Sequence, residues 1–418
     1  MDVKNLIVGV DLNRKESQIC YYERGTQDAV SAPVQVGSAR SAFPTVLSWI
    51  PETGEWHYGI EAEFFAEQKN GILIDQLYDL CADGNSFHLE QNQYSGGELL
   101  AIFLRQALTM VGVTDPARQV DGIMITVPAL TRPFVQAIRQ AYEELGIPRG
   151  RTYLQDYKES FYTYTLYQKQ ELWSRKVGLF LFREEGELRV TFQSLSVNNR
   201  TKPATVSVTE GQTISLDGDG SRKDQKFSIL IRESLKEELY SSIYLLGSAF
   251  DESWAAASTA LLCRGQRRVF CGDNLFAKGA CFAAREKVED RMLKDYLYLG
   301  NDLIRYNLGM EMRINGSPAY YPLVTAGVNW YETEKECEFL LDQEEELVFL
   351  VSGMEDGKRR RYSMALPGLP KRPAKTSRLR LHVEYDSPRT CQIDVEDLGF
   401  GEIFPSSGKK WHETMEEK

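Results

Sequence analysis

The strongest constraint on the fold is a hairpin pattern that occurs twice before residue 200. Residues 5–12 are an apolar run of buried-strand length, and residues 17–22 predict a second strand after a short polar turn. Residues 177–182 and 188–192 repeat this arrangement. Further strands and helices follow each hairpin, so the sequence predicts an α/β fold made of two similar halves, each with a mixed sheet and flanking helices.

Local signals place the elements that follow. Ser95 and Glu98 have the spacing of a capping box and predict a helix that runs to Met110. Pro128 ends a strand over residues 122–127. Additional helices are predicted over residues 131–146, 157–173, 227–239, 253–263 and 274–286, and a strand over residues 242–246.

Helical periodicity stops near residue 306, and short alternating strands replace it. Their number and spacing predict a β-sandwich. The predicted domains are a first α/β lobe over 1–175, a second lobe with a shortened helical subdomain over 176–305, a sandwich over 306–405 and a polar, loose tail over 406–418.

Composition excludes several classes of protein. The net charge of -11 argues against nucleic acid or an anionic membrane as partner, and the basic run 358–361 is interpreted as a solvated loop. Seven cysteines at wide spacing, without a CxxC pair, and four scattered histidines predict neither a disulfide framework nor a metal site. Without an expected signal peptide or membrane span, the chain is predicted to be cytoplasmic.

Several short motifs occur in the order found in the seventy-kilodalton heat-shock chaperone (DnaK-type) family, within the actin/sugar-kinase/heat-shock ATPase superfamily. The sequence resembles that family over nearly its whole length. The resemblance rests on residues 9–12, 43–47, 125–129, 154–157, 243–248 and 274–284, and on residues 308–311, 366–370, 379–386 and 390–397 in the sandwich region. It implies a two-lobed actin-like ATPase fold followed by a substrate-binding sandwich.

The resemblance also implies that two Gly-rich hairpins hold ATP and Mg²⁺. In such hairpins backbone N–H groups approach the phosphates, and an Asp orients Mg²⁺ or the attacking water. The first hairpin keeps Asp11 and Ser17, but Asn13, Arg14 and Lys15 replace its Gly-Thr-Thr. Arg14 and Lys15 either pair with phosphate directly or are solvated turn residues. Both interpretations stay open.

The second hairpin and the adenosine loop depart further from the family pattern. Residues 181–187 stand where the family has Asp-Leu-Gly-Gly-Gly-Thr. They include Glu184 and Glu185, and Gly186 is the remaining candidate phosphate contact. Gly247 and Ser248 stand at the adenosine Gly-Gly of the family. The altered hairpins predict that hydrolysis has been lost although the fold is retained.

The family's general-base Glu corresponds to Asp156, which is one methylene shorter. If the site is active, Asp11 and Asp156 are the candidate catalytic residues. The leading hypothesis is a chaperone-like, non-hydrolysing scaffold that binds another protein or an extended peptide. The alternative is an active ATP-dependent molecular chaperone. The sandwich, expected to have no helical lid, either contacts a partner or serves as a structural cap.

Overall fold

The structure is a computed structural model. It describes residues 5–35, 40–68, 71–236, 238–247, 249–314, 316–342, 346–354 and 359–416. Contacts within the chain divide it into two compact units, Met1–Gly300 and Asn301–Lys418, called here the N-terminal and C-terminal units. This boundary falls slightly before the predicted one at residue 305. In the described ranges no helix has the length and apolar character needed to cross a membrane.

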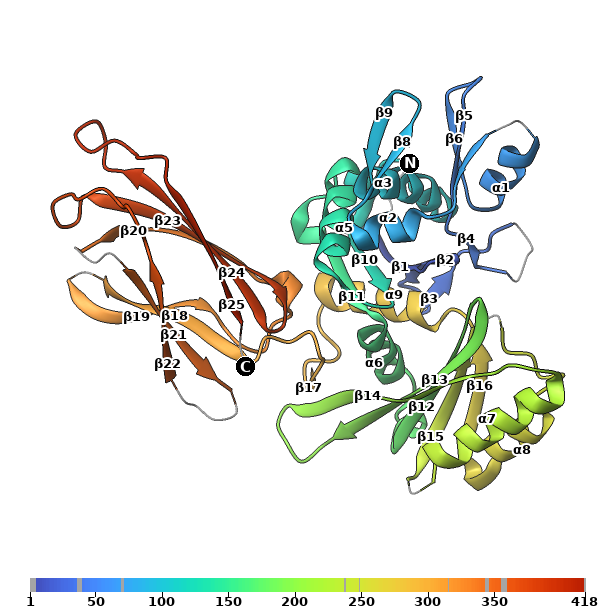
Figure 1. The fold of residues 1–418 in the computed structure, drawn as a ribbon. Helices are drawn as coiled ribbons and strands as arrows, with labels where there is room; N and C mark the ends of the chain where they lie inside the picture. The colour runs from blue at the N-terminus through green and yellow to red at the C-terminus, as the bar shows by residue number, and fades with distance from the viewer. Residues whose placement is uncertain are drawn as a thin grey trace. The chain divides into compact units, whose positions relative to one another are not determined.

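The first mixed sheet of the N-terminal unit is built on the predicted hairpin (Figure 1). Its strand order is β11 (Thr152–Asp156), β10 (Val120–Val127), β1 (Leu6–Leu12), β2 (Glu16–Glu23) and β3 (Asp28–Ser31), and β4 (Phe43–Pro44) pairs with β2. Strands β1, β10 and β11 are parallel, whereas β1, β2 and β3 are antiparallel. One face packs against α2 (Leu77–Asp83), α3 (Gly96–Ala107) and α5 (Arg132–Glu144) through a shared apolar core.

Side chains cap the starts of α3 and α5. The Ser95 hydroxyl accepts the backbone N–H of Glu98, and the Glu98 carboxylate accepts the backbone N–H of Ser95, so the capping box is confirmed. Thr131 caps α5 by accepting the N–H of Phe134.

The second mixed sheet repeats the order and directions of the first. Its order is β16 (Arg268–Gly272), β15 (Tyr240–Leu246), β12 (Lys176–Glu185), β13 (Glu187–Asn198), β14 (Ala204–Ser215) and β17 (Tyr296–Tyr298). Strand β12 is parallel to β15 and antiparallel to β13, as β1 is to β10 and β2. One face packs against α7 (Gly220–Ser234) and α8 (Ala256–Leu262). The two halves are therefore one arrangement of strands used twice.

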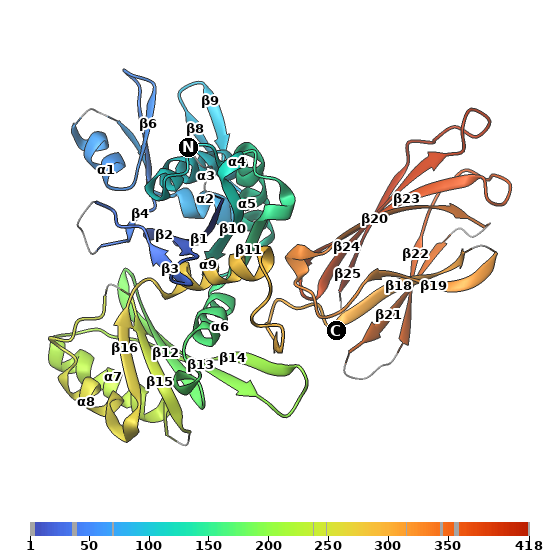
Figure 2. The same cartoon turned by 180° about the vertical axis from the view of Figure 1, so that it is seen from behind.

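Two helices cross between the halves (Figure 2). Helix α6 (Tyr157–Tyr167) follows β11 of the first sheet but packs on the second, and α9 (Leu275–Val288) follows β16 of the second sheet but packs on the first. The contact of α9 with β1 is close, since a Cβ on Gly9 would lie 2.2 Å from the backbone nitrogen of Cys281. Each predicted lobe is therefore completed by a helix from the other.

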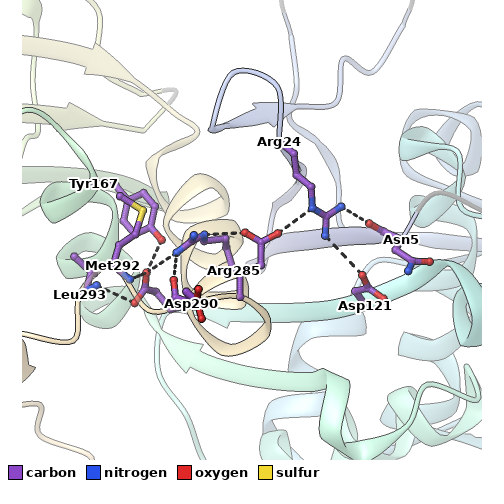
Figure 3. A network of polar contacts seen from close by, with 10 residues as sticks. Asn5, Arg24, Asp121, Tyr167, Arg285, Asp290, Met292 and Leu293 are labelled. Carbon is purple, nitrogen blue, oxygen red and sulfur yellow. Dashed lines mark hydrogen bonds and ion pairs between the residues drawn. The ribbon is translucent and has the colours of Figure 1, made fainter.

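A polar network fixes the end of α9 (Figure 3). Glu286 accepts hydrogen bonds from the Tyr167 hydroxyl at 2.6 Å and from the backbone of Met292 and Leu293 at 2.9 and 3.0 Å. Arg24, on the β2–β3 turn, donates to Glu289 at 2.9 Å. The network ties α6, α9 and the first sheet together.

Smaller elements complete the N-terminal unit. They are β5 (Leu47–Ile50), β6 (Glu55–Tyr58), β7 (Ile72–Ile74), α1 (Gly59–Gln68), β8 (Ser86–Leu89), β9 (Asn92–Ser95), α4 (Pro116–Gln119) and the 3-10 turns η1 (Leu108–Val111), η2 (Arg149–Arg151), η3 (Gln170–Leu172) and η4 (Arg264–Gln266).

Two predicted helices have different ends in the structure. The helix predicted to reach Trp173 ends at Tyr167, because Gln168 has an extended backbone. The helix expected over 227–239 is α7, which starts earlier because Asp219 caps it and ends at Ser234.

The C-terminal unit contains two antiparallel sheets. The strand order of the first sheet is β19 (Ser317–Val324), β18 (Tyr306–Ile314), β21 (Glu346–Gly353) and β22 (Arg359–Ala365). The order of the second is β20 (Glu334–Leu341), β23 (Ser377–Ser387), β24 (Thr390–Gly399) and β25 (Lys410–Glu416). The unit also contains the 3-10 turn η5 (Trp330–Glu332).

Two predictions about this unit are corrected by the structure. The expected loose tail contains β25, which pairs with β24, and Arg359–Arg361 belong to β22 instead of a loop. Lys358 lies outside the described residues.

A buried charge pair supports the C-terminal unit. Asp397 is fully buried and accepts two hydrogen bonds of 2.8 Å from Arg372. The backbone N–H groups of Ser407 and Gly399 donate to the same carboxylate at 2.9 and 3.0 Å. Although burial alone raises it, these hydrogen bonds hold the pKa of Asp397 well below its ordinary value.

Candidate functional site

The first hairpin turn is shaped by an asparagine. The Asn13 side-chain oxygen accepts the backbone N–H groups of Lys15 and Glu16 at 3.1 and 3.0 Å. This local bonding forms a tight turn without a glycine. Arg14 points to α2, where it donates to the Asp79 carboxylate at 2.9 and 2.7 Å and lies 5.5 Å from the ring centre of Tyr78. Arg14 therefore has an intramolecular carboxylate partner.

The two hairpin turns lie next to each other. Lys15 Nζ is 3.6 Å from a carboxylate oxygen of Glu184, which precedes Gly186 in the second turn. This ion pair joins the turns of the two halves. Both side chains are more than half exposed, so the ion pair contributes little stability, on the order of 0–1 kcal/mol. Gly186 has a positive φ of 78°, and a Cβ there would meet no neighbouring atom.

Asp11 is buried at the end of β1 and is hydrogen-bonded inside the protein. The hydroxyl of Tyr157, the first residue of α6, donates to the Asp11 carboxylate at 2.5 Å. The Tyr157 ring stacks on Phe276 of α9, with ring centres 3.7 Å apart and an angle of 12° between the planes. The Arg183 guanidinium carbon lies 5.7 Å from the Tyr157 ring centre. These four residues are called the Asp11 site.

Burial dominates the electrostatics of this site. Burial raises the pKa of Asp11 from 3.8 to about 7. The hydrogen bond from Tyr157 and the charge of Arg183 lower this pKa, whereas the charge of Asp273 raises it further. Burial and the Asp11 charge also raise the pKa of the Tyr157 hydroxyl well above 10. A Mg²⁺ ligand has to be ionised, and this environment favours the neutral carboxyl.

Ser17 and Asp156 have structural partners. Ser17 is fully buried, and its hydroxyl lies 2.8 Å from that of Thr45. The Asp156 carboxylate accepts the backbone N–H of Glu159 at 2.8 Å and so caps α6. Ser17 therefore serves the packing of the first sheet, while Asp156 fixes the start of the helix that carries Tyr157.

Gly247 is required by a close approach of two strands. Its φ is 114°, and a Cβ there would lie 2.2 Å from the carbonyl oxygen of Phe182. The rings that gather beside this contact are Phe182, Phe227, Phe250 and Trp254, with centre distances of 5.1 Å for Phe182–Phe250 and 5.8 Å for Phe250–Trp254. Ser248, the other predicted adenosine-loop residue, lies outside the described residues.

The sequence did not identify Tyr157, Arg183 or Phe276 as site residues. Tyr157 directly follows the candidate Asp156, and Arg183 stands within the altered second hairpin, so proximity to those candidates was the available signal. Phe276 carried no local signal, because its role depends on the placement of α9. In the part of the chain that the structure describes, no cluster of three or more His, Cys, Asp or Glu side chains could hold a metal ion.

Comparison with known families places the chain in a group without an assigned function. Residues 28–301 match the family of unknown function DUF5716, in its C-terminal region, and the chain belongs to that family. Residues 303–417 match a domain of unknown function, DUF8552. No curated protein matches the chain. The two matched regions meet close to the boundary between the two units.

Proposed function

We propose that the chain is a chaperone-like protein of the actin-like ATPase type whose nucleotide site is closed by its own side chains. It acts as a non-hydrolysing scaffold that binds another protein or an extended peptide. The observation that carries this proposal is the buried hydrogen bond from Tyr157 to Asp11. The carboxylate predicted to orient Mg²⁺ accepts a hydrogen bond from a protein hydroxyl.

The duplicated strand order supports the actin-like assignment. Both sheets combine an antiparallel hairpin with two parallel strands on the same side of its first strand. Helices α6 and α9 lie between the sheets and contact each other through the Tyr157–Phe276 stack. Duplicated mixed sheets of this kind are expected of the superfamily that the sequence resembles.

The other residues predicted to bind the nucleotide or act on it have partners within the protein, which supports the loss of hydrolysis. Arg14 is paired with Asp79, Ser17 is buried against Thr45, and Asp156 caps a helix. Losing one preorganised donor or charge commonly reduces turnover by about 10²–10³-fold, and here several would be missing together. ATP turnover is therefore expected at or below background.

Calorimetric titration of the full chain with ATP and Mg²⁺, combined with a phosphate-release assay, tests the proposal. Neither binding heat nor turnover above background is expected. Mg²⁺-dependent turnover that disappears in Asp11→Ala would overturn the proposal. A Tyr157→Phe variant removes the hydroxyl that is bonded to Asp11 but keeps the ring stacked on Phe276. It therefore tests the hydrogen bond separately from the ring packing.

One observation favours the alternative, an active ATP-dependent chaperone. The two hairpin turns meet through the ion pair between Lys15 and Glu184. A group that took the place of the Glu184 carboxylate would therefore lie close to the Lys15 ammonium. A phosphate group that displaced Glu184 would gain a cation from the first half. In that case Glu184→Gln should tighten ATP binding, whereas the non-hydrolysing scaffold predicts no response to this change.

A further inference from the structure

One turn of the C-terminal unit presents large apolar side chains to solvent. It consists of residues 400–404, between β24 and β25, and is called here the apolar turn. Ile403 is 82% exposed and Phe400 is 46% exposed. Among the large apolar side chains of the described residues, Ile403 is the most exposed. Burial of such a side chain against a partner is favourable, so the turn is a candidate contact surface.

Hydrogen bonds hold the apolar turn in one shape. The backbone N–H of Phe400 donates to the carbonyl oxygen of Phe404 at 2.6 Å and closes the turn. Gly399 before the turn and Ser407 after it donate their backbone N–H groups to the buried Asp397 carboxylate at 3.0 and 2.9 Å. Because the backbone on both sides is already fixed, ordering the turn on binding costs little free energy.

The same unit contains a hollow on the β19–β18–β21–β22 sheet. Its volume is about 240 Å³, and its lining includes Tyr320, Pro322, Leu350 and Ser352. Leu350 alternates with the buried Phe349 along β21, so the hollow lies on the face opposite to Phe349. Because a water molecule occupies about 30 Å³, the hollow has room for a branched aliphatic side chain.

The hollow and the apolar turn lie toward opposite ends of the unit. Strand β22 has seven residues and runs from Arg359, which lines the hollow, to Ala365. Seven residues of a strand span about 20 Å. Just beyond Ala365, the carbonyl oxygen of Pro367 accepts the indole N–H of Trp411 at 3.2 Å, near the start of β25, which the apolar turn precedes. A single copy therefore cannot place its own turn in its own hollow.

We propose that the apolar turn of one copy inserts into the hollow of a second copy of the chain. Ile403 then packs against Pro322 and Leu350, which line the hollow. The charges at the contact are complementary, because Glu402 next to Ile403 is exposed and Arg359 is part of the lining. Each pair of copies keeps one unused turn and one unused hollow, so the contact can repeat from head to tail.

A second copy fits the apolar turn better than a lipid bilayer does. Glu402 stands among the apolar residues of the turn, and the chain has a net charge of -11, so an anionic membrane surface repels it. A second copy supplies a concave apolar site with a cation in its lining. The inference goes beyond the proposed scaffold function and does not depend on the nucleotide site.

Sedimentation velocity of the full chain tests this proposal, in salt of about 150 mM, which screens the repulsion between copies beyond about 8 Å. The contact is small, so we expect self-association with a Kd on the order of 100 µM. Ile403→Asp should weaken it at least about tenfold, because a charged carboxylate does not enter an apolar hollow without a large desolvation cost. Leu239→Asp changes a residue of the N-terminal unit that is 67% exposed and should leave association unchanged.

The hollow is tested by a matched pair of tryptophan variants. Ser352→Trp fills the hollow and should weaken self-association at least about tenfold. Ser363→Trp adds the same side chain to the same face of β22, outside the lining, and should leave association unchanged. Ile403→Asp keeps an intact hollow and Ser352→Trp keeps an intact turn. An equimolar mixture of these two should therefore form a one-to-one dimer with the wild-type Kd, although neither variant associates alone.

A wild-type chain that stays monomeric at about 500 µM, five times the expected Kd, would overturn the inference. A mixture that does not dimerise, or an equal loss of association in the two control variants, would also overturn it. Binding to phosphatidylserine vesicles that requires Ile403, in a chain that does not self-associate, would assign the turn to a membrane instead. Circular dichroism of each variant confirms folding. ATP titration of the same preparations tests the nucleotide proposal separately, so the two can fail independently.

Discussion

Asp11→Asn should stabilise the N-terminal unit at alkaline pH. The ordinary pKa of the carboxyl is 3.8, and burial raises it to about 7 in the folded chain. Each tenfold change in proton affinity corresponds to about 1.4 kcal/mol. Between these two pKa values the folded state keeps a proton that the unfolded state has released, so this residue lowers the free energy of unfolding as pH rises.

Above about pH 7 the ionised Asp11 destabilises the fold by about 4 kcal/mol. Asparagine has no charge and still accepts the Tyr157 hydroxyl, so it removes this cost. The variant should gain about 4 kcal/mol near pH 8 and about 1 kcal/mol near pH 4.5. Other titrating groups cancel in the difference between the two proteins.

The assay has to separate the two units, since unfolding of a chain with two units is not a single transition. Urea unfolding at each pH, followed by a hydrogen-exchange pulse and mass spectrometry of peptides from β1, reports the N-terminal unit alone. If Asp11→Asn destabilises the unit at both pH values, the carboxylate makes a favourable interaction that needs its charge. The interpretation of a closed, neutral site would then be wrong.

Three further changes test the packing described above. Tyr157→Phe leaves Asp11 without its donor and should cost about 1–3 kcal/mol near pH 8, with a smaller cost near pH 4.5, in the same exchange assay. Glu286→Gln keeps the shape but removes one acceptor oxygen and the charge, so protection of α9 should fall by about 1–3 kcal/mol, whereas the exposed Glu61→Gln should leave it unchanged. Arg372→Met leaves the Asp397 carboxylate buried without its cation and should destabilise the C-terminal unit by about 3–5 kcal/mol in urea. Because the pKa of Asp397 is lowered on folding, its stabilisation should be present above about pH 4 and decline in more acidic solution. A flat response of the wild-type C-terminal unit there would contradict this sign.

The sequence predicted elements whose signals are local. The apolar runs of β1 and β12 and the capping box at Ser95 depend on neighbouring residues, and all appear where expected. Strand β25 was missed, because its residues are mostly polar and it gains its structure from pairing with β24. Local polarity is a poor guide to a strand at the end of a sheet.

The candidate site was predicted only in part, for a similar reason. Asp11 was a candidate because it lies in the first hairpin of the repeated pattern. The partner of Asp11 does not, because Tyr157 is 146 residues away in the sequence. A carboxyl at the end of an apolar strand could meet a metal, a cation or a phenol, and the choice depends on how α6 and α9 pack.

The exchange of α6 and α9 between the two sheets has a consequence for synthesis of the chain. A ribosome completes β1 and β2 early, but the helix that covers one face of their sheet is translated only with residues 275–288. Until then Ile7, Cys20 and Met124 belong to a sheet face without its cover. The first half is therefore an incomplete folding unit, and a nascent chain that stalled before residue 275 would expose an apolar surface to other chains.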